Sequence, residues 1–297
     1  MGEKIKSMKW YFACNEQSKE YEPLIKAAVT SAIKNTTLKP HFIYDGKPNN
    51  FTKWLEERGV KIIYHRSNLY TVLEKKYKGN ELKISTGAYL RCDIPMIETE
   101  EDFVLYTDCD VIFLKDIEEI NPKPEYFCCA PEVDVENKKL FNTGVMYMNI
   151  KNLRKTYNGF CKFIKWNLWR LVTWDQTAYQ LYYGTKCSPL DLKYNHKIYW
   201  GIDENAVILH YHGAKPTMFV DEEKIKNMDY FNGLLYRKNP ESYRYYLEMF
   251  KEYYSEIQYD EDGIQKLNDG LYPITKPPKN PINIRIKNFI RKHIFNV

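Results

Sequence analysis

The first hundred residues alternate between strand-like and helix-like patterns, and this alternation constrains the fold more than any other feature of the chain. Apolar strand-like stretches occupy residues 9–14, 41–45, 60–65 and 103–107. Helical patterns lie between them at about 21–34, 51–59 and 85–97, with Gly59 at a helix end and Ser85 as the expected cap of the third helix. A βαβ rhythm of this kind predicts an α/β fold with a mostly parallel central sheet flanked by helices.

The second half of the chain has a more mixed pattern. Short strands are expected at 125–132, 142–150 and 206–213, and helices at 153–168 and 174–184. From about residue 221 to 272 the pattern is helical, and a proline-broken linker at 273–283 precedes a final helical segment. We therefore expect an α/β domain over 1–220 in two halves (about 9–115 and 116–220), a helical extension packed on it over 221–272, and a separate tail over 273–297.

The charge of the chain is concentrated at its C-terminal end. The net charge is +5, yet residues 270–297 carry six Lys or Arg and no acid. The remainder has 38 basic against 39 acidic residues, a net charge of −1. The body of the protein is therefore not predicted to bind nucleic acid.

The tail over 282–297 has the pattern of a basic amphipathic helix. An apolar stripe recurs at helical spacing, and the four basic residues lie largely off it; the stripe is Ile286, Phe289, Ile290, His293, Ile294 and Val297. This pattern predicts a peripheral anchor on an anionic membrane surface. The alternative is a helix that packs on the main domain or mediates a dimer.

Cysteine usage and hydropathy indicate the compartment. The seven cysteines form no CxxC pair and are odd in number, and those in strand-like runs serve as small apolar residues. No signal peptide or membrane-spanning stretch is recognisable. We expect a cytoplasmic protein, peripheral on the inner face of the membrane if the tail binds lipid.

Two carboxylates interrupt the apolar run "FVLYTDCDVIF" at 103–113. Asp108 and Asp110 follow the strand of residues 103–107, and ligands of parallel sheets bind beyond the carboxyl ends of strands. Burying two acids costs several kcal/mol unless they are compensated. Two carboxylates at i and i+2 can hold one hard cation, Mg²⁺ or Mn²⁺, whereas the simpler interpretation is a solvated turn.

A D-x-D after an apolar strand also occurs in haloacid-dehalogenase-type phosphatases, where the first Asp is the nucleophile. Those proteins carry Thr or Val two residues after the second Asp, where this chain has Ile112. They place the motif near the start of their catalytic domain, and no later acidic pair for Mg²⁺ is recognisable here. This alternative is rejected.

Six stretches in order resemble the GT-A glycosyltransferases, and glycosyltransferase family 8 most of all. They are "ACNEQ", "GAYLRCDIP", "YTDCDVIF", "FNTGVMYMNI", "WDQTAYQ" and "ILHYHGAKP", and they span about 9–216. The resemblance implies transfer of a hexose-type sugar from a nucleotide sugar, UDP-linked, to a glycan such as a lipopolysaccharide or capsule-type saccharide, with retention. The alternatives are an inverting GT-A enzyme or an inactive carbohydrate-binding relative.

The resemblance assigns a metal and a diphosphate site. Asp108, Asp110 and His210 match the family's metal ligands, and Asp108 also lies near the donor ribose. An imidazole in the set favours Mn²⁺ over Mg²⁺. His212 lies on the same strand face and is the alternative ligand; with Gly213 and Lys215 it belongs to the donor-binding loop, which is shorter here than the family pattern.

Further residues match the donor-binding and catalytic positions of the family. Asp175 and Gln176 match its D-Q pair on the donor-sugar side; Asp175 is otherwise a helix cap. The remaining donor contacts are Arg91, Asn142, Gly144, Asn15 and Gln17. The structural alternatives are a surface ion pair of Arg91 with Asp93 or Glu98, and a simple turn at 142–144.

Overall fold

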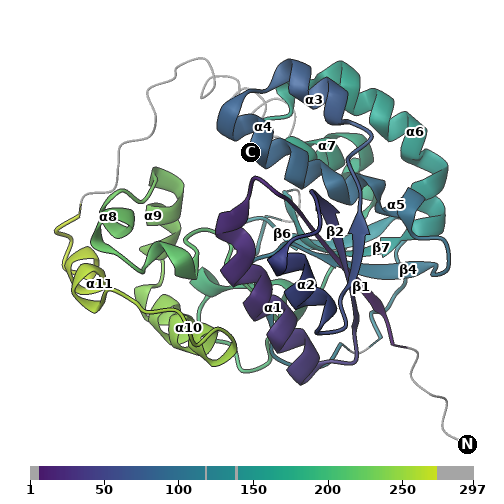
Figure 1. Cartoon of the computed structure of the whole chain (residues 1–297). Helices are drawn as coiled ribbons and strands as arrows, with labels where there is room; N and C mark the ends of the chain where they lie inside the picture. The colour runs from purple at the N-terminus through teal and green to yellow at the C-terminus, as the bar shows by residue number, and fades with distance from the viewer. Residues whose placement is uncertain (1–6, 118, 138–139, 273–297) are drawn as a thin grey trace, which may run out of the picture.

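The computed structural model describes residues 7–117, 119–137 and 140–272. Its centre is a seven-stranded sheet with the order β3-β2-β1-β4-β7-β6-β8 (Figure 1). Strands β3, β2, β1 and β4 run parallel, β7 is antiparallel to both of its neighbours, and β8 is parallel to β6. The strands are β1 (Lys9–Asn15), β2 (Lys39–Asp45), β3 (Lys61–Tyr64), β4 (Phe103–Thr107), β6 (Phe127–Pro131), β7 (Phe141–Asn149) and β8 (Cys187–Pro189).

A second, three-stranded sheet lies beside the first. Strand β10 (Ile208–His210) pairs antiparallel with β5 (Val111–Phe113) and parallel with β9 (His196–Lys197). Because β4 and β5 are separated only by residues 108–110, the chain passes from one sheet to the other at the two aspartates. This transition brings the end of β10 close to the end of β4.

Side-chain alternation along β1 divides the core of the main sheet into two layers. Tyr11 and Ala13 face a cluster that contains residues of the helices from α3 to α7, whereas Trp10, Phe12 and Cys14 face α1 and α2. All seven residues of β1 are buried, as expected for a strand covered on both faces. The flanking helices are α1 (Glu22–Asn35), α2 (Asn50–Glu56), α3 (Tyr70–Lys76), α4 (Gly79–Ala88), α5 (Ile94–Ile97), α6 (Ile150–Asn167) and α7 (Trp174–Tyr183).

The predicted helix at 85–97 is wrong in its limits and continuity. Helix α4 begins earlier, at Gly79, and the chain then forms a 3-10 helix over Tyr89–Asp93 before α5. Pro95 lacks an N–H and its ring would clash with the carbonyl of Arg91 in a continuous α-helix. Ser85 is not a cap: it lies inside α4, and its hydroxyl donates to the carbonyl of Leu82 at 3.1 Å.

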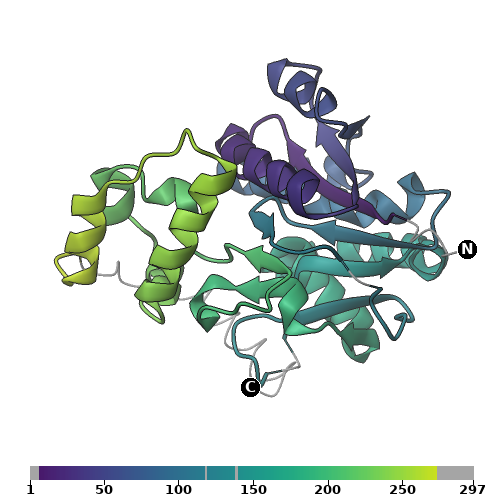
Figure 2. The same ribbon diagram turned by 90° about the horizontal axis from the view of Figure 1, so that it is seen from below.

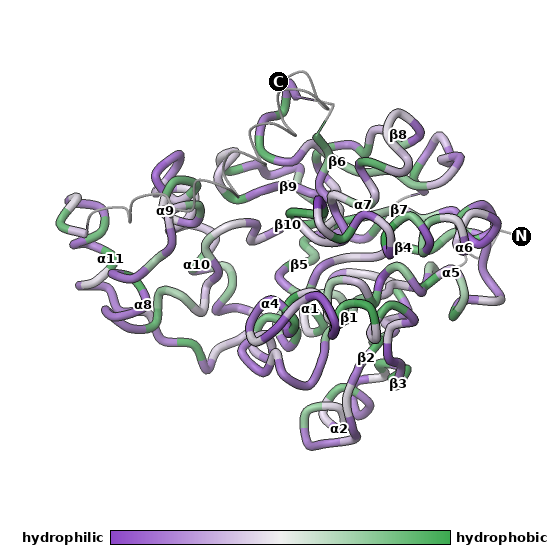
Figure 3. The backbone as a smooth tube through the Cα atoms, turned by 90° about the horizontal axis from the view of Figure 1, so that it is seen from above, coloured by the Kyte–Doolittle hydropathy of each residue, from purple (hydrophilic) through white to green (hydrophobic). Residues whose placement is uncertain are grey.

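The region after the sheets is helical. Helices α8 (Glu222–Lys226), α9 (Tyr230–Tyr236), α10 (Pro240–Tyr253) and α11 (Glu261–Asn268) lie to one side of the sheet (Figures 2 and 3). A third apolar cluster joins them to α1 and β10, with Leu24, Leu209 and Tyr243 among its buried members. The tail predicted over 273–297 lies outside the described residues. Among the described residues, no helix is long and apolar enough to cross a membrane.

The expected fold class is confirmed. The parallel half of the sheet, β3-β2-β1-β4, arises from the alternating first hundred residues, and helices cover both faces. The mixed pattern of the second half corresponds to the antiparallel β7 and to the small sheet.

Candidate active site

A cleft of about 740 Å³ opens at the carboxyl ends of β1 and β4. Eight of the predicted site residues line it: Arg91, Asp108, Asp110, Asn142, Asp175, Gln176, His212 and Lys215. Its walls come from α4, from the β4–β5 connection, from the beginning of β7 and from the beginning of α7. The cleft therefore brings together segments that are separated by more than a hundred residues in the sequence.

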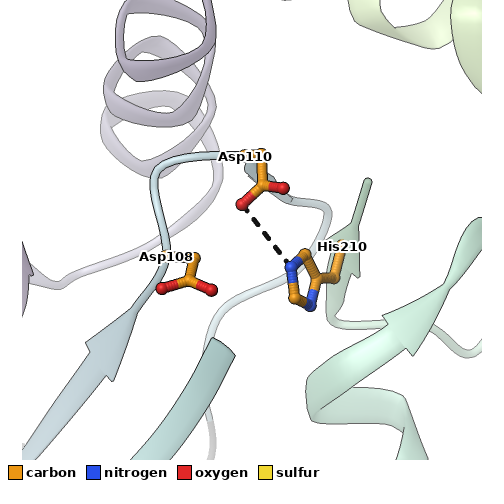
Figure 4. A group of neighbouring side chains, drawn as sticks. All are labelled: Asp108, Asp110 and His210. Carbon is orange, nitrogen blue, oxygen red and sulfur yellow. Dashed lines mark ion pairs between the residues drawn. The ribbon is translucent and has the colours of Figure 1, made fainter. Parts of the chain in front are cut away.

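Asp108, Asp110 and His210 form the group best suited to a metal ion. One ligand atom of each lies within 4.8 Å of the others, and Nε2 of His210 is 3.5 Å from Oδ1 of Asp110 (Figure 4). Two carboxylates and an imidazole suit Mn²⁺ and related divalent ions. The donor set fits a divalent cation.

A chain of hydrogen bonds fixes the orientation of His210. The N–H of Gly144 donates to Oδ1 of Asn142 at 3.0 Å, so that atom is an oxygen, and Nδ2 of Asn195 donates to the same oxygen at 3.1 Å. Oδ1 of Asn195 therefore faces Nδ1 of His210, at 2.9 Å, and accepts its proton. The lone pair of His210 is then on Nε2, the nitrogen that faces Asp110, as a metal ligand requires.

Side-chain cations compensate both carboxylates of the D-x-D. Nη2 of Arg91 donates to Oδ1 of Asp108 at 2.7 Å, and the ammonium of Lys215 contacts Oδ2 of Asp110. Burial opposes ionisation of Asp110, but Lys215 and His210 hold the pKa of its carboxyl well below its usual range. The sequence interpretation assigned this compensation to a metal alone, and it did not include the pairing of Lys215 with Asp110.

Arg91 links the D-x-D to α7. Its Nε lies 3.0 Å from Oδ2 of Asp175, and its Nη1 donates to the carbonyl of Thr143 at 2.6 Å. Burial opposes the charge of Arg91, yet Asp108 and Asp175 raise its pKa well above the usual value. The alternative of a surface pair with Asp93 or Glu98 is therefore wrong.

Asp175 is a buried carboxylate rather than a helix cap. The residue before α7 is Thr173, which makes no side-chain cap, and Asp175 lies in the first turn. Burial raises the pKa of Asp175 to about 6, although Arg91 opposes the shift. Trp174, which lies between Thr173 and Asp175 in the sequence, begins α7 beside the cleft. Its φ of 46° is a strained value for a residue with a side chain.

Gln176 has a fixed amide orientation. Its Oε1 accepts from the backbone N–H of Thr143 at 3.1 Å and from Nδ2 of Asn142 at 3.2 Å. Because Thr143 N–H is always a donor, the atom that faces it must be the oxygen. The Gln176 carbonyl, expected near the sugar, is thus engaged within the protein, and its NH₂ group is the end without a hydrogen-bond partner among the described residues.

His212 belongs to a different group from His210. Its Nε2 is 3.4 Å from Oε1 of Glu132, and its Nδ1 is 2.9 Å from the hydroxyl of Tyr199. Burial opposes ionisation of Glu132, but His212 and Lys197 lower the pKa of its carboxyl to about 2. Sequence reasoning missed Glu132, although it directly follows the carboxyl end of a strand, β6.

Five predicted residues are not among those that line the cleft: His210 and Gly144, which lie against the carboxylates of the D-x-D, and Asn15, Gln17 and Gly213. The amide of buried Asn15 is used internally: Nδ2 donates to the carbonyl of Lys83 at 2.7 Å, and Oδ1 accepts from the N–H of Gln17 at 3.1 Å. Gln17 is exposed. Gly213 has φ of 100°, so it is the turn after His212 that needs glycine.

The sequence model of Glycosyl transferase family 8 matches residues 15–216, about two thirds of the chain. The chain belongs to this family. Glucoside xylosyltransferase 1 from Homo sapiens is 24% identical over 230 residues, which cover 70% of this chain and 48% of the human protein. The protein of that name from Rattus norvegicus is 26% identical over 231 residues, 70% of this chain and 49% of its own. The chain thus spans about half the length of the curated relatives it matches.

Solved structures share the GT-A fold of the family. A crystal structure of an active-site mutant of LgtC superimposes with a TM-score of 0.60 at 16% identity, covering 86% of this chain and 98% of LgtC. The glycosyltransferase GlyE of Streptococcus pneumoniae has a TM-score of 0.56 at 18% identity, over 83% of this chain and 64% of GlyE. Another LgtC structure contains donor and acceptor sugar analogs.

Proposed function

We propose that the protein transfers a hexose-type sugar from a UDP-linked donor to a glycan acceptor, with Mn²⁺ as cofactor and Mg²⁺ as its substitute. One observation carries the proposal: Asp108 and Asp110, which form a candidate metal group with His210, line the same cleft as Asp175 and Gln176. Membership of glycosyl transferase family 8 supports the reaction class.

The charges of the cleft suit rupture of a glycosyl–phosphate bond. The bond from the anomeric carbon to the diphosphate oxygen breaks and its electron pair leaves with the nucleoside diphosphate. Asp108, Asp110 and His210 would hold a divalent ion, which would supply positive charge to that leaving group. Lys215, which contacts Asp110, adds a second positive charge on the same side.

Positive charge develops on the sugar ring as the bond breaks. Asp175 lines the same cleft and is not one of the three candidate metal ligands, and we assign it to stabilise this charge. Gln176, with its oxygen engaged by Asn142 and Thr143, presents its NH₂ group as a donor to a sugar hydroxyl. Asn142 and Gly144 lie at the beginning of β7, where the N–H of Gly144 donates to Oδ1 of Asn142.

We propose retention rather than inversion because the resemblance to glycosyltransferase family 8 implies it. An inverting enzyme uses a carboxylate base near the acceptor, and its pKa is best close to the working pH. Glu132 lines the cleft, but its pKa is lowered to about 2, so it is a weak base. The anomeric configuration of the isolated product, determined by NMR coupling constants, distinguishes the two.

The proposed acceptor is a lipopolysaccharide or capsule-type saccharide in polysaccharide biosynthesis, reached by a cytoplasmic protein on the inner face of the membrane. The support is the basic amphipathic pattern of residues 282–297 in the sequence. Comparison of the full chain with a variant ending at Tyr272 in vesicle co-sedimentation tests the tail. Equal binding by the two would contradict its role as an anchor.

Titration calorimetry of UDP with and without Mn²⁺ tests the donor and the cofactor. We expect binding heat with the ion and little after chelation; negligible heat in both conditions contradicts the proposal. Slow hydrolysis of a UDP-sugar separates an active enzyme from an inactive carbohydrate-binding relative. A panel of UDP-sugars then identifies the transferred sugar.

A further inference from the structure

Helix α6 presents a solvent face that no other helix in the described structure covers. Its buried residues, such as Leu153 and Tyr157, pack on the core, and its exposed positions recur at i, i+4, i+7 and i+11 on the opposite side. These positions form what we call the α6 face: Lys151, Lys155, Lys162, Lys165, Trp166 and, in the 3-10 helix that follows, Trp169. The face lies on the side of the molecule remote from α8–α11 (Figures 1 and 3).

The two tryptophans are the most exposed large apolar side chains among the described residues. Trp166 is 77% exposed and Trp169 is 67% exposed. Their spacing of three residues places them side by side at the C-terminal end of the face. Because a tryptophan side chain exposes a large apolar area, two together at the surface indicate a binding partner rather than chance exposure.

The charge around the tryptophans has one sign. No acidic residue occurs between positions 150 and 174, whereas this segment contains six Lys or Arg. Within the ranges that the structure describes, neither Lys162 nor Lys165 forms an ion pair. The neighbouring α3–α4 region exposes Glu74 and Glu81, but its exposed lysines at 75, 76 and 78 outnumber them.

The α6 face adjoins the edge of the cleft. Trp169 precedes by three residues Val172, which lines the cleft with Thr173 and Trp174, so the two Cα atoms are within about 11 Å of each other. The hydroxyl of Tyr77 donates to the carbonyl of Leu168 at 3.3 Å, which fastens the α3–α4 junction to the end of α6. A surface bound at the tryptophans therefore lies beside the cleft.

We infer that the α6 face docks the protein on an anionic lipid bilayer, with Trp166 and Trp169 at the interface and the lysines over acidic headgroups. Tryptophan at the headgroup level beside lysine is the combination that bilayer interfaces favour. A polyanion would match the lysines but leave both indole rings without apolar contact. Binding to the bilayer does not depend on the proposed function. Its usefulness rests on that function, since a lipid-linked acceptor would then lie at the edge of the cleft.

The test uses the full chain and vesicles of phosphatidylglycerol and phosphatidylcholine, compared with phosphatidylcholine alone. Wild-type protein should co-sediment with the anionic vesicles, and lipids brominated in their acyl chains should quench its tryptophan fluorescence. Trp166→Ser/Trp169→Ser should abolish the quenching and lower the partition coefficient at least about tenfold. Lys162→Glu/Lys165→Glu should lower it by a similar factor, and salt should weaken wild-type binding.

Matched variants separate the α6 face from other surfaces. Lys47→Glu/Lys53→Glu makes the same charge change at exposed positions near α2 and should leave partitioning within about twofold of wild type. Leu271→Ser, which removes a 66% exposed side chain elsewhere, should leave the quenching intact. Arg291→Glu/Lys292→Glu reports the contribution of the tail separately.

Several results would overturn the inference. The first is wild-type protein that does not bind anionic vesicles, and the second is α6-face variants that partition like wild type. The third is a loss of heparin binding in the lysine variant together with no quenching of wild-type fluorescence by the brominated lipids. A dimer in sedimentation velocity that the tryptophan variant dissolves, without vesicle binding, would assign the face to self-association. UDP-sugar hydrolysis, measured on the same preparations without vesicles, is expected unchanged in the variants; its absence in wild type would contradict the proposed function and leave the docking result intact.

Discussion

A Cβ atom on Gly144 would lie 2.3 Å from Cε1 of His210. It would also lie 2.9 Å from Oδ2 of Asp108, so any side chain at this position displaces two of the three candidate metal ligands. We predict that Gly144→Ala lowers Mn²⁺-dependent UDP binding at least about a hundredfold, because the ligands can no longer converge. Titration calorimetry measures this loss, and circular dichroism shows that the variant is folded.

Gly159→Ala is the control for this substitution. Gly159 lies in α6, and a Cβ there would come within 2.6 Å of the hydroxyl of Tyr182 in α7. The Tyr182 ring can move aside. UDP binding by Gly159→Ala should match wild type. Equal affinities for wild type and Gly144→Ala would mean that the three ligands do not act together.

Asn195 should be a second determinant of metal affinity although it is not itself one of the three candidate metal ligands. Fully buried, it accepts the Nδ1 proton of His210 at 2.9 Å and thereby holds the tautomer whose Nε2 is a ligand. We predict that Asn195→Leu weakens Mn²⁺-dependent UDP binding about 10- to 100-fold, the usual cost of losing such a partner. Asn195→Asp, which keeps the acceptor, should recover much of the affinity; equal losses in both would argue for a purely structural role.

Asp175 gives a pH dependence with a defined sign. Its pKa is raised from 3.8 to about 6 by burial, so between these values the native state binds a proton that the unfolded state has released. The free energy of unfolding should therefore fall as pH rises from about 4 to 6, by at most about 1.4 kcal/mol per pH unit. Asp175→Asn should lack this component in urea titrations at several pH values.

The pKa of Asp175 also predicts how the rate of transfer falls at low pH. Since we assign the ionised form of Asp175 to the sugar side, transfer should decline below about pH 6 in wild type. Asp175→Ala should keep Mn²⁺-dependent UDP binding and lose transfer, because Asp175 is not one of the three candidate metal ligands. Loss of UDP binding in this variant would place Asp175 in the donor site instead.

The sequence predicts the parallel half of the fold because each strand there has its own local signal. Residues 9–14 and 41–45 were expected as strands, and they lie within β1 and β2. Asp108 and Asp110 were expected at a strand end for the same reason. The limits of α4 and α5 could not be placed correctly, since the helical period runs through residues 85–97 whereas a 3-10 helix separates α4 from α5 and Pro95 lies in the first turn of α5.

The missed parts of the site depend on tertiary contacts rather than on local pattern. Nothing near Asn195 in sequence indicates that it orients His210, and the pair forms only because β9 and β10 lie side by side. Glu132 likewise gains its role from His212, eighty residues later. Asn15 shows the converse: a motif match placed it in the donor site, whereas its amide bonds to α4 within the protein.

The choice between the two histidines supplies the sharpest mutational comparison. Nε2 of His210 faces Asp110 at 3.5 Å, whereas Nε2 of His212 faces Glu132 at 3.4 Å, away from the D-x-D. We predict that His210→Ala abolishes Mn²⁺-dependent UDP binding, as Asp110→Ala should, while His212→Ala keeps it within about threefold. Calorimetry of both variants, with folding verified by their melting temperatures, measures the difference. If His212→Ala lost binding and His210→Ala retained it, the ligand assignment would be reversed and the hydrogen bond from His210 to Asn195 would serve only the packing of the small sheet.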